Sequence, residues 1–357
     1  MCPLIKELEN NPKIKSFVCV TAQHRQMLDQ VLEAFQITPD YDLNLMKESQ
    51  TLFDITSRVL MGIGDVIKKC NPDIVLVHGD TTTSFAAALA AFYCMVPVGH
   101  VEAGLRTWDK YSPYPEEMNR TLTGDIAELH FSPTKQNMQN LKNENINNNI
   151  YITGNTVIDA FKTTVIPDYV YENKQLSQID FLGKKVVLLT AHRRENLGKP
   201  LEQICKAVKR IAEEYKELSI VYPVHLNPAV RKTVFDILDG QERIHLIDPL
   251  NVMDMHNLMS KSFLVLTDSG GLQEEAPYFG IPVLVLRTET ERPEAVEMGT
   301  VKVVGVEEDA IVLNVKNLID NQIEYDKMAK SVNPYGDGHA SERIADALLN
   351  WYQSTRS

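Results

Sequence analysis

Short apolar runs alternate along the chain with longer segments whose apolar residues recur every three or four positions. The short runs are rich in β-branched residues and apolar at successive positions, which is typical of strands buried on both faces of a parallel sheet. The longer segments have the spacing of amphipathic helices, as in residues 26–35, 52–69 and 201–215. This alternation predicts an α/β protein with doubly wound parallel sheets.

The expected strands fall into two series. The first series comprises residues 16–21, 73–78, 96–101, 129–132 and 150–153. The second series comprises residues 185–190, 219–223, 244–247, 263–267, 282–286 and 301–304. A polar stretch without a strand pattern, residues 168–182, separates the two. We therefore expect two Rossmann-like domains with a cleft between them, in which ligands bind beyond the carboxyl ends of the strands.

Composition narrows the classes of partner. The 357 residues carry 36 Lys and Arg against 48 Asp and Glu, and this net charge of −12 argues against broad contact with nucleic acid or anionic lipid. A small anionic ligand remains compatible with it, provided that basic residues gather locally. No apolar run is long enough for a membrane span or a signal peptide, so we expect a cytoplasmic protein. The five cysteines are widely spaced and lack a metal-binding pattern, which predicts reduced thiols and no metal site.

Carboxylates follow successive expected strands of the first domain. Asp80 and Glu102 come directly after two neighbouring strands, and Glu116 begins the next helical segment. Because the carboxyl ends of parallel strands meet at one edge of a sheet, we expect the three side chains to face one site. Clustered carboxylates shift each other's pKa values and suit the removal and return of a proton. The alternative interpretation is structural, since a carboxylate in a first helical turn, here Glu116 or Glu117, is stabilising by itself.

Basic and glycine-rich turns follow the strands of the second domain. His192 and Arg193 follow the first strand of that series, and Ser269, Gly270 and Gly271 follow the fourth. Arginines at such a turn are easier to explain when they hold an anion, although pairing with nearby carboxylates is the alternative. Two glycines at a strand-to-helix turn let backbone N–H groups approach a diphosphate. We therefore predict a nucleotide diphosphate site at this edge of the second sheet.

Further polar side chains are placed similarly along the second series. Glu275 lies one to two turns after the glycines, where it can accept hydrogen bonds from ribose hydroxyls, and Arg292 lines the same rim. His225 follows the second strand of the series. Four other histidines are interpreted as ordinary surface or packing residues: His130, His245, His256 and His339.

Taken together, these motifs resemble the non-hydrolysing UDP-N-acetylglucosamine 2-epimerase family. The matching strings are spread over nearly the whole chain: residues 78–83, 100–107, 113–120, 153–158, 192–196, 268–277 and 333–344. The resemblance implies a fold of the glycosyltransferase-B type, whose C-terminal helix packs back on the first domain. We therefore expect one domain of residues 1–155 plus 340–357 and a second of residues 156–339.

The resemblance also implies an activity and its residues. The family epimerises UDP-GlcNAc to UDP-ManNAc reversibly at carbon 2, by elimination and re-addition of UDP without a redox cofactor. The implied catalytic positions are Asp80, Glu102, Glu116 and His192, and the sequence leaves open which carboxylate removes the proton. The implied UDP-binding positions are His192, Arg193, Ser269, Gly270, Gly271, Glu275 and Arg292.

Bacterial members of the family bind a second UDP-GlcNAc as an allosteric activator and form homodimers, which the resemblance implies for this chain too. The matching allosteric positions are Gln23, Gln26, Arg193 and His225. Ser49 departs from the arginine that relatives often carry there.

The start of the chain also departs from the family pattern. Family members begin with a strand and a Gly-Thr-Arg-Pro-Glu turn, whereas the first pattern here, residues 3–9, is already helical. Because that strand and turn contribute to the sheet and the diphosphate contacts, we expect a chain that begins this way to turn over severely more slowly.

Three alternatives remain open from the sequence. They are a nucleotide-sugar glycosyltransferase, a hydrolysing epimerase and an inactive UDP-sugar-binding module. The carboxylates of the first domain disfavour the transferase, because sugar transfer needs no proton traffic at carbon 2.

Overall fold

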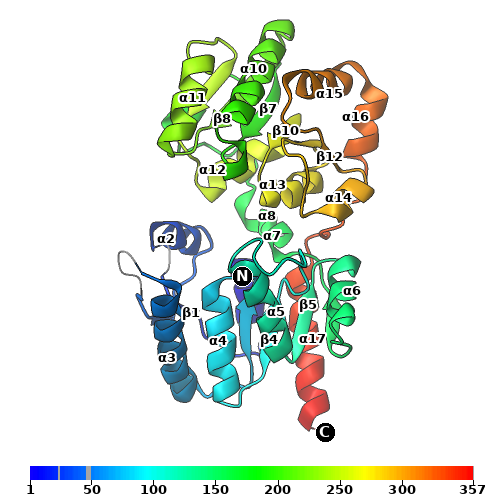
Figure 1. Cartoon of the computed structure of the whole chain (residues 1–357). Helices are drawn as coiled ribbons and strands as arrows, with labels where there is room; N and C mark the ends of the chain where they lie inside the picture. Colours follow the sequence, from blue (N-terminus) through cyan, green and yellow to red (C-terminus); the bar gives the residue numbers. More distant parts are fainter. Residues whose placement is uncertain (23–24, 46–49, 357) are drawn as a thin grey trace. The chain divides into compact units, whose positions relative to one another are not determined.

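The computed structural model describes residues 1–22, 25–45 and 50–356, without the side chains of Gln26 and Met27 (Figure 1). The chain forms two compact units. Unit 1 comprises Met1–Ala160 and Tyr335–Ser357, and unit 2 comprises Phe161–Pro334. The division therefore falls after Ala160 and before Tyr335, five residues from each of the expected bounds, which were after residue 155 and before residue 340.

Unit 1 contains two parallel sheets. A two-stranded sheet pairs β1 with β2, and a four-stranded sheet has the order β3-β4-β5-β6. The strands are β1 (Cys19–Val20), β2 (Tyr41–Asp42), β3 (Val75–His78), β4 (Val98–Val101), β5 (Leu129–Ser132) and β6 (Ile150–Ile152). The helices are α1 (Cys2–Asn10), α2 (Arg25–Ala34), α3 (Leu52–Cys70), α4 (Thr82–Tyr93), α5 (Glu116–Ile126), α6 (Lys135–Asn143), α7 (Thr156–Asp159) and α17 (Ala340–Arg356).

The last helix, α17, is an integral part of unit 1. Its buried Ile344 and Leu348 pack in one cluster with Leu4 of α1 and Phe131 of β5. The buried carboxylate of Asp159 accepts hydrogen bonds from the backbone N–H groups of the first two residues of α17, at 3.0 and 2.6 Å. An acidic group at a helix N-terminus is favourable, so this contact fixes where the chain re-enters unit 1.

Unit 2 contains one six-stranded parallel sheet with the order β12-β11-β10-β7-β8-β9. Its strands are β7 (Lys185–Thr190), β8 (Leu218–Pro223), β9 (Ile244–Ile247), β10 (Leu264–Thr267), β11 (Val283–Val285) and β12 (Val301–Val303). Its helices are α8 (Phe161–Thr164), α9 (Lys174–Ser177), η1 (Arg194–Asn196), α10 (Lys199–Glu214), α11 (Pro228–Leu238), α12 (Val252–Ser260), α13 (Gly270–Glu275), η2 (Ala276–Phe279), α14 (Pro293–Glu297), α15 (Glu308–Asp320) and α16 (Gln322–Ala329). The strand order reverses direction between β7 and β10, and this switch point is where doubly wound sheets bind their ligands.

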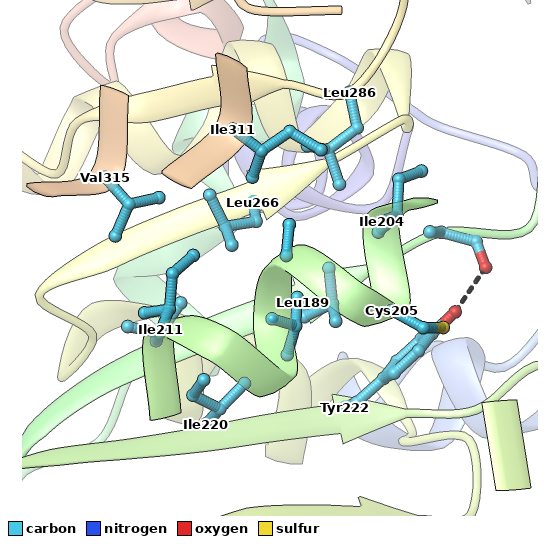
Figure 2. Close-up of a cluster of buried hydrophobic side chains, with 14 of the residues drawn as sticks. Leu189, Ile204, Cys205, Ile211, Ile220, Tyr222, Leu266, Leu286, Ile311 and Val315 are labelled. Atoms are coloured by element: carbon cyan, nitrogen blue, oxygen red, sulfur yellow. Dashed lines mark hydrogen bonds between the residues drawn. The ribbon is translucent and has the colours of Figure 1, made fainter. Parts of the chain in front are cut away.

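The core of unit 2 explains why these elements form (Figure 2). Helix α10 buries residues at the spacing of one helical face, among them Ile204 and Ile211, against Leu189 and Leu266 of the two central strands. Each such side chain contributes roughly 1.5–3 kcal/mol when it leaves water. Tyr222 is buried with them, and its hydroxyl donates to the backbone carbonyl of Ala191 at 2.6 Å. Ala191, the residue before the His192–Arg193 turn, is thereby anchored to the core.

No helix among residues 1–22, 25–45 and 50–356 is both long and apolar enough to cross a bilayer.

Candidate active site

The turn after β3 presents Asp80 at the carboxyl end of the unit 1 sheet. Gly79 has a φ of +67°, and Thr81 begins α4 by accepting a hydrogen bond from the N–H of Ser84 at 3.2 Å. A Cβ on Gly79 would lie 3.0 Å from Oε2 of Glu102, so the Glu102 carboxylate lies directly against this turn. The structure therefore brings Asp80 and Glu102 to neighbouring positions on one sheet edge.

Glu102 itself has an unusual backbone. It follows the buried strand β4 with a φ of +66°, a region that residues with a Cβ rarely adopt. Asn155 donates from Nδ2 to Oε1 of Glu102 at 3.3 Å. Strained backbone of this kind is often found at functional positions, where surrounding contacts hold it in place.

The two adjacent glutamates at the start of α5 have different surroundings. Glu117 is 3% exposed, and its Oε1 accepts hydrogen bonds from the N–H groups of Thr107 and Trp108, at 3.0 and 2.9 Å. Glu116 is half-buried, and its carboxylate makes no hydrogen bond or ion pair to any residue that the structure describes. The carboxylate of Glu117 therefore has a structural role at the start of α5, whereas the carboxylate of Glu116 is available for chemistry.

Helix α5 is tied to the turn after β3. Arg120 donates from Nη2 to Oδ2 of Asp80 at 2.5 Å, and Asn119 donates from Nδ2 to the backbone carbonyl of Asp80 at 2.9 Å. Glu116 and Arg120 are four residues apart on one helix face. The contacts thus connect Glu102, Asp80 and the helix that carries Glu116.

In unit 2, a buried carboxylate organises the switch point. Asp268 follows β10 and is fully buried; its Oδ2 accepts hydrogen bonds from the N–H groups of His192 and Arg193, both at 2.8 Å, and from Nδ2 of Asn196 at 3.0 Å. The turns after β7 and β10 are therefore joined through one side chain. Sequence reasoning did not single out Asp268, because its role depends on atoms that are distant in the sequence.

Two guanidinium groups flank the glycine turn after β10. The Nη2 atoms of Arg193 and Arg292 lie 3.7 and 3.8 Å from the position that a Cβ on Gly270 would take. Arg292 also pairs through Nε with Glu274, and Nη1 of Arg193 lies 3.7 Å from Oε1 of Glu291. Two cations beside a glycine backbone form a site suited to a phosphate group.

Glu275 lies at the same turn. A Cβ on Gly271 would be 3.1 Å from Oε1 of Glu275 and 3.9 Å from Oγ of Ser269, so the carboxylate and the hydroxyl line one small region. Burial, with a smaller effect of the adjacent Glu274, raises the pKa of Glu275 to about 7.

His256 of α12 also lies beside this carboxylate. The side chain is 5% exposed, its Nε2 lies 3.6 Å from Oε2 of Glu275, and its Nδ1 is hydrogen-bonded to Oγ1 of Thr164 at 2.8 Å. The interpretation as a packing residue was therefore incomplete, because His256 is buried but contacts a candidate site residue. Its position within an apolar helix gave no sequence signal of that contact.

His192 and His225 stack on each other, with ring centroids 5.0 Å apart and planes inclined by 9°. Burial lowers the pKa of His192, and its Nδ1 lies 3.8 Å from Oδ1 of Asp268. The imidazole of His225 therefore belongs to the surroundings of the His192–Arg193 turn. Gln23, Ser49 and the side chain of Gln26 lie outside the described residues.

Two units built on parallel sheets, with a cationic glycine turn at the switch point of unit 2, define a nucleotide-binding enzyme with a fold of the glycosyltransferase-B type. MurG of Acinetobacter baumannii, at 14% identity and a TM-score of 0.61, is similar in fold alone. The fold class expected from the sequence is thereby confirmed.

Comparison with known proteins identifies the family. A family model described as UDP-N-acetylglucosamine 2-epimerase matches residues 6–349. The UDP-N-acetylglucosamine 2-epimerase of Bacillus subtilis is 56% identical over 354 residues, which cover 99% of this chain and 92% of the relative. The crystal structure of UDP-GlcNAc 2-epimerase from Neisseria meningitidis bound to UDP-GlcNAc is 50% identical, with a TM-score of 0.88 over 98% of this chain and 96% of that one. The chain belongs to the UDP-N-acetylglucosamine 2-epimerase family, and the resemblance inferred from its motifs is confirmed.

Proposed function

We propose that this protein interconverts UDP-GlcNAc and UDP-ManNAc by eliminating UDP and adding it back. The observation that carries the proposal is the pairing of two kinds of site on one chain of this family. Unit 1 presents carboxylates at the ends of β3 and β4 and at the start of α5, and unit 2 presents cations at its switch point.

The carboxylates of unit 1 carry the proton. In the elimination step, one of Asp80, Glu102 and Glu116 takes the proton from carbon 2. The electron pair of that C–H bond forms a double bond between carbons 1 and 2, and UDP leaves with the electron pair of the bond between carbon 1 and its phosphate oxygen. In the return step, the phosphate oxygen attacks carbon 1 and a second carboxylate delivers a proton to the other face of carbon 2. The reaction involves no net oxidation, and a pair of carboxylates in different surroundings suits it.

The switch point of unit 2 holds the leaving group. Arg193 and Arg292 carry the positive charge that stabilises a departing diphosphate, and His192 lies next to Arg193. The backbone of Gly270 and Gly271 and the hydroxyl of Ser269 supply donors to phosphate oxygens, and ionised Glu275 accepts from the ribose hydroxyls. UDP must stay bound during the life of the unsaturated intermediate, so several weak contacts to it are more useful than a single strong one.

The test is to incubate the protein with UDP-GlcNAc in deuterated water and to follow the sugars by NMR. The proposal expects deuterium at carbon 2 of both intact UDP-sugars. Glu116→Gln should lower the exchange rate on the order of 100-fold or more, as loss of a general acid or base does. Asp125→Asn is the matched control, because Asp125 is exposed on the same helix. UDP-GlcNAc that binds without any exchange at carbon 2 would refute the proposal.

The same proposal includes a second UDP-GlcNAc site and a cytoplasmic location. Stacking of His225 on His192, beside Arg193, supports a site for a further ligand next to the substrate. The cysteines are all free, as in a reducing compartment. A sigmoidal dependence of rate on UDP-GlcNAc concentration that becomes hyperbolic in His225→Asn is expected. A hyperbolic curve for the unaltered protein would contradict the second site.

Self-association into a homodimer completes the proposal. Helices α3 and α4 pack against each other (Figure 1), and each carries exposed apolar side chains. Phe53 is 87% exposed, Met61 69%, Tyr93 66% and Met95, just after α4, 92%. Large apolar side chains exposed on two neighbouring helices are consistent with an interaction surface. Sedimentation equilibrium should give the mass of a dimer, and Phe53→Asp combined with Met61→Asp should give that of a monomer.

A further inference from the structure

Arg120 joins two carboxylates beneath the acidic edge of unit 1. The residue is 9% exposed; its Nη2 donates to Oδ2 of Asp80 at 2.5 Å and its Nη1 donates to Oε2 of Glu117 at 3.0 Å. The planar guanidinium has a fixed fork of donors, so it sets the separation and direction of the two carboxylates together.

Glu117 extends this network to the segment after β4. Its second oxygen, Oε1, accepts from the N–H groups of Thr107 and Trp108. Trp108 has a φ of +66°, a backbone conformation that needs such contacts to persist. One continuous set of hydrogen bonds therefore runs from the 107–108 backbone through Glu117 and Arg120 to Asp80.

Stability alone does not explain this arrangement. Buried ion pairs contribute little to stability, because removing both charges from water offsets their attraction. The Nε atom of Arg120 is in addition buried without a hydrogen-bonding partner among the described residues, which is unfavourable. An arrangement with these costs is better explained by a requirement for geometry at the site.

The geometry at Asp80 indicates what that requirement is. Arg120 binds only Oδ2, and Oδ1 of Asp80 accepts no hydrogen bond from any residue within 1–22, 25–45 and 50–356. One oxygen is held and the other is left for a proton. Asn119 fixes the backbone carbonyl of the same residue. The start of α5, which carries Glu116, is positioned by the same contacts.

We propose that Arg120 and Glu117 are positioning residues for the epimerisation, because their hydrogen bonds fix Asp80, the 107–108 backbone and the start of α5 as one rigid unit. Neither residue exchanges a proton with the sugar. The inference rests on the proposed function, since it assigns roles in that reaction.

The experiment measures kcat and KM for deuterium incorporation at carbon 2. Arg120→Met should lower kcat on the order of 100-fold, the usual effect of misplacing a reacting group by about 1 Å, while KM changes less than about threefold. Arg120→Lys should recover part of that loss, because an ammonium keeps the charge but cannot hold both carboxylates. Glu117→Gln should lower kcat about tenfold, since the amide oxygen keeps one of the two sets of contacts.

The matched control is Glu144→Gln. Glu144 binds Arg106 through two hydrogen bonds of 2.9 and 2.6 Å in the same unit, and in the described part of the chain it makes no hydrogen bond or ion pair to Asp80, Glu102 or Glu116. Its substitution should leave kcat within about threefold of the unaltered protein. Urea unfolding of every variant identifies any that lose activity by unfolding. In that case the milder substitutions decide the question: Arg120→Lys, which keeps the charge, and Glu117→Gln, which keeps one set of contacts.

The outcomes separate the two proposals. If the unaltered protein binds UDP-GlcNAc but exchanges no deuterium, the proposed function fails and the positioning roles fail with it. If the unaltered protein exchanges normally while folded Arg120→Met and Glu117→Gln keep its kcat, only the positioning roles are overturned. A loss of kcat in Glu144→Gln equal to that in Glu117→Gln would also overturn them, because any buried ion pair would then have the same effect.

Discussion

Replacing Asp268 tests how the nucleotide site of unit 2 is built. Its carboxylate accepts hydrogen bonds from two backbone N–H groups, those of His192 and Arg193, and from Asn196. Asp268→Ala leaves the two backbone N–H groups without this acceptor, at about 1–3 kcal/mol each, whereas Nδ2 of Asn196 keeps its hydrogen bond to the backbone carbonyl of Leu286. We therefore expect a loss of about 2–6 kcal/mol in the free energy of unfolding. Asp268→Asn keeps an acceptor for all three and loses only the charge, so the expected loss is about 1–3 kcal/mol.

Ligand binding should separate these variants further. In Asp268→Ala the His192–Arg193 backbone is no longer held, and UDP binding must then order it at about 1–2 kcal/mol per residue. We expect at least a tenfold weaker affinity for UDP. Asp268→Asn keeps the turn in place and removes a negative charge near the diphosphate, so its affinity for UDP should equal or exceed that of the unaltered protein.

The assay combines urea unfolding followed by far-UV circular dichroism with calorimetric titration of UDP. Both tryptophans, Trp108 and Trp351, lie in unit 1, so their fluorescence follows that unit separately. Asp248→Asn is the control, because Asp248 is an exposed acid of unit 2 whose nearest cation is 3.4 Å away. Equal stability of Asp268→Ala and the control would refute the reasoning, as would equal UDP affinity of Asp268→Ala and Asp268→Asn.

Three further predictions follow from single contacts. Burial raises the pKa of Glu275 to about 7, so the folded state binds its proton more tightly than the unfolded state, and stability is lost as the pH rises from about 4.5 through 7. In urea unfolding, Glu275→Gln should therefore be about 2–3 kcal/mol more stable than the unaltered protein at pH 8 and equal to it at pH 4. A difference that does not depend on pH would contradict this. Gly104→Ala should lower the free energy of unfolding by about 3 kcal/mol or more, because Gly104 has a φ of +93° and a Cβ there would lie 2.2 Å from the backbone oxygen of Asn137. Thermal unfolding measures the effect, and an unchanged Tm would show that the turn adjusts freely. Asp159→Ala should lower the free energy of unfolding by about 2–4 kcal/mol, because it leaves two N–H groups at the start of α17 unpaired. Asp159→Asn should lower it by about half as much, and unfolding of both variants is followed through Trp351 fluorescence. The same value for both variants would argue against a role of the charge.

Much of the fold was predictable, because periodicity reports burial. Every expected strand corresponds to an observed one, with ends shifted by a few residues, and strands 129–132, 185–190 and 244–247 have the observed bounds. Strand β2 was missed, since a strand of two residues cannot display a period of two.

The candidate site was predictable only in part. Motif position indicates which residues follow a strand, and Asp80, Glu102, His192 and Gly270 do so. It cannot distinguish Glu116 from Glu117, which are adjacent acids in one helical turn. The difference arises from what lies opposite them, namely the 107–108 backbone and Arg120 for Glu117 alone.

Four buried carboxylates share one structural role that sequence patterns do not reveal. Each accepts hydrogen bonds from the N–H groups of two consecutive residues that belong to another segment. The pairs are Glu117 with 107–108, Asp159 with 340–341, Asp254 with 172–173 and Asp268 with 192–193. A buried carboxylate needs several donors to remain ionised, and two adjacent N–H groups supply them while fixing a turn that has no regular structure. Burial therefore separates these four acids from the proposed proton carriers: the four are enclosed by the backbone of a turn, whereas Asp80, Glu102 and Glu116 remain half-exposed.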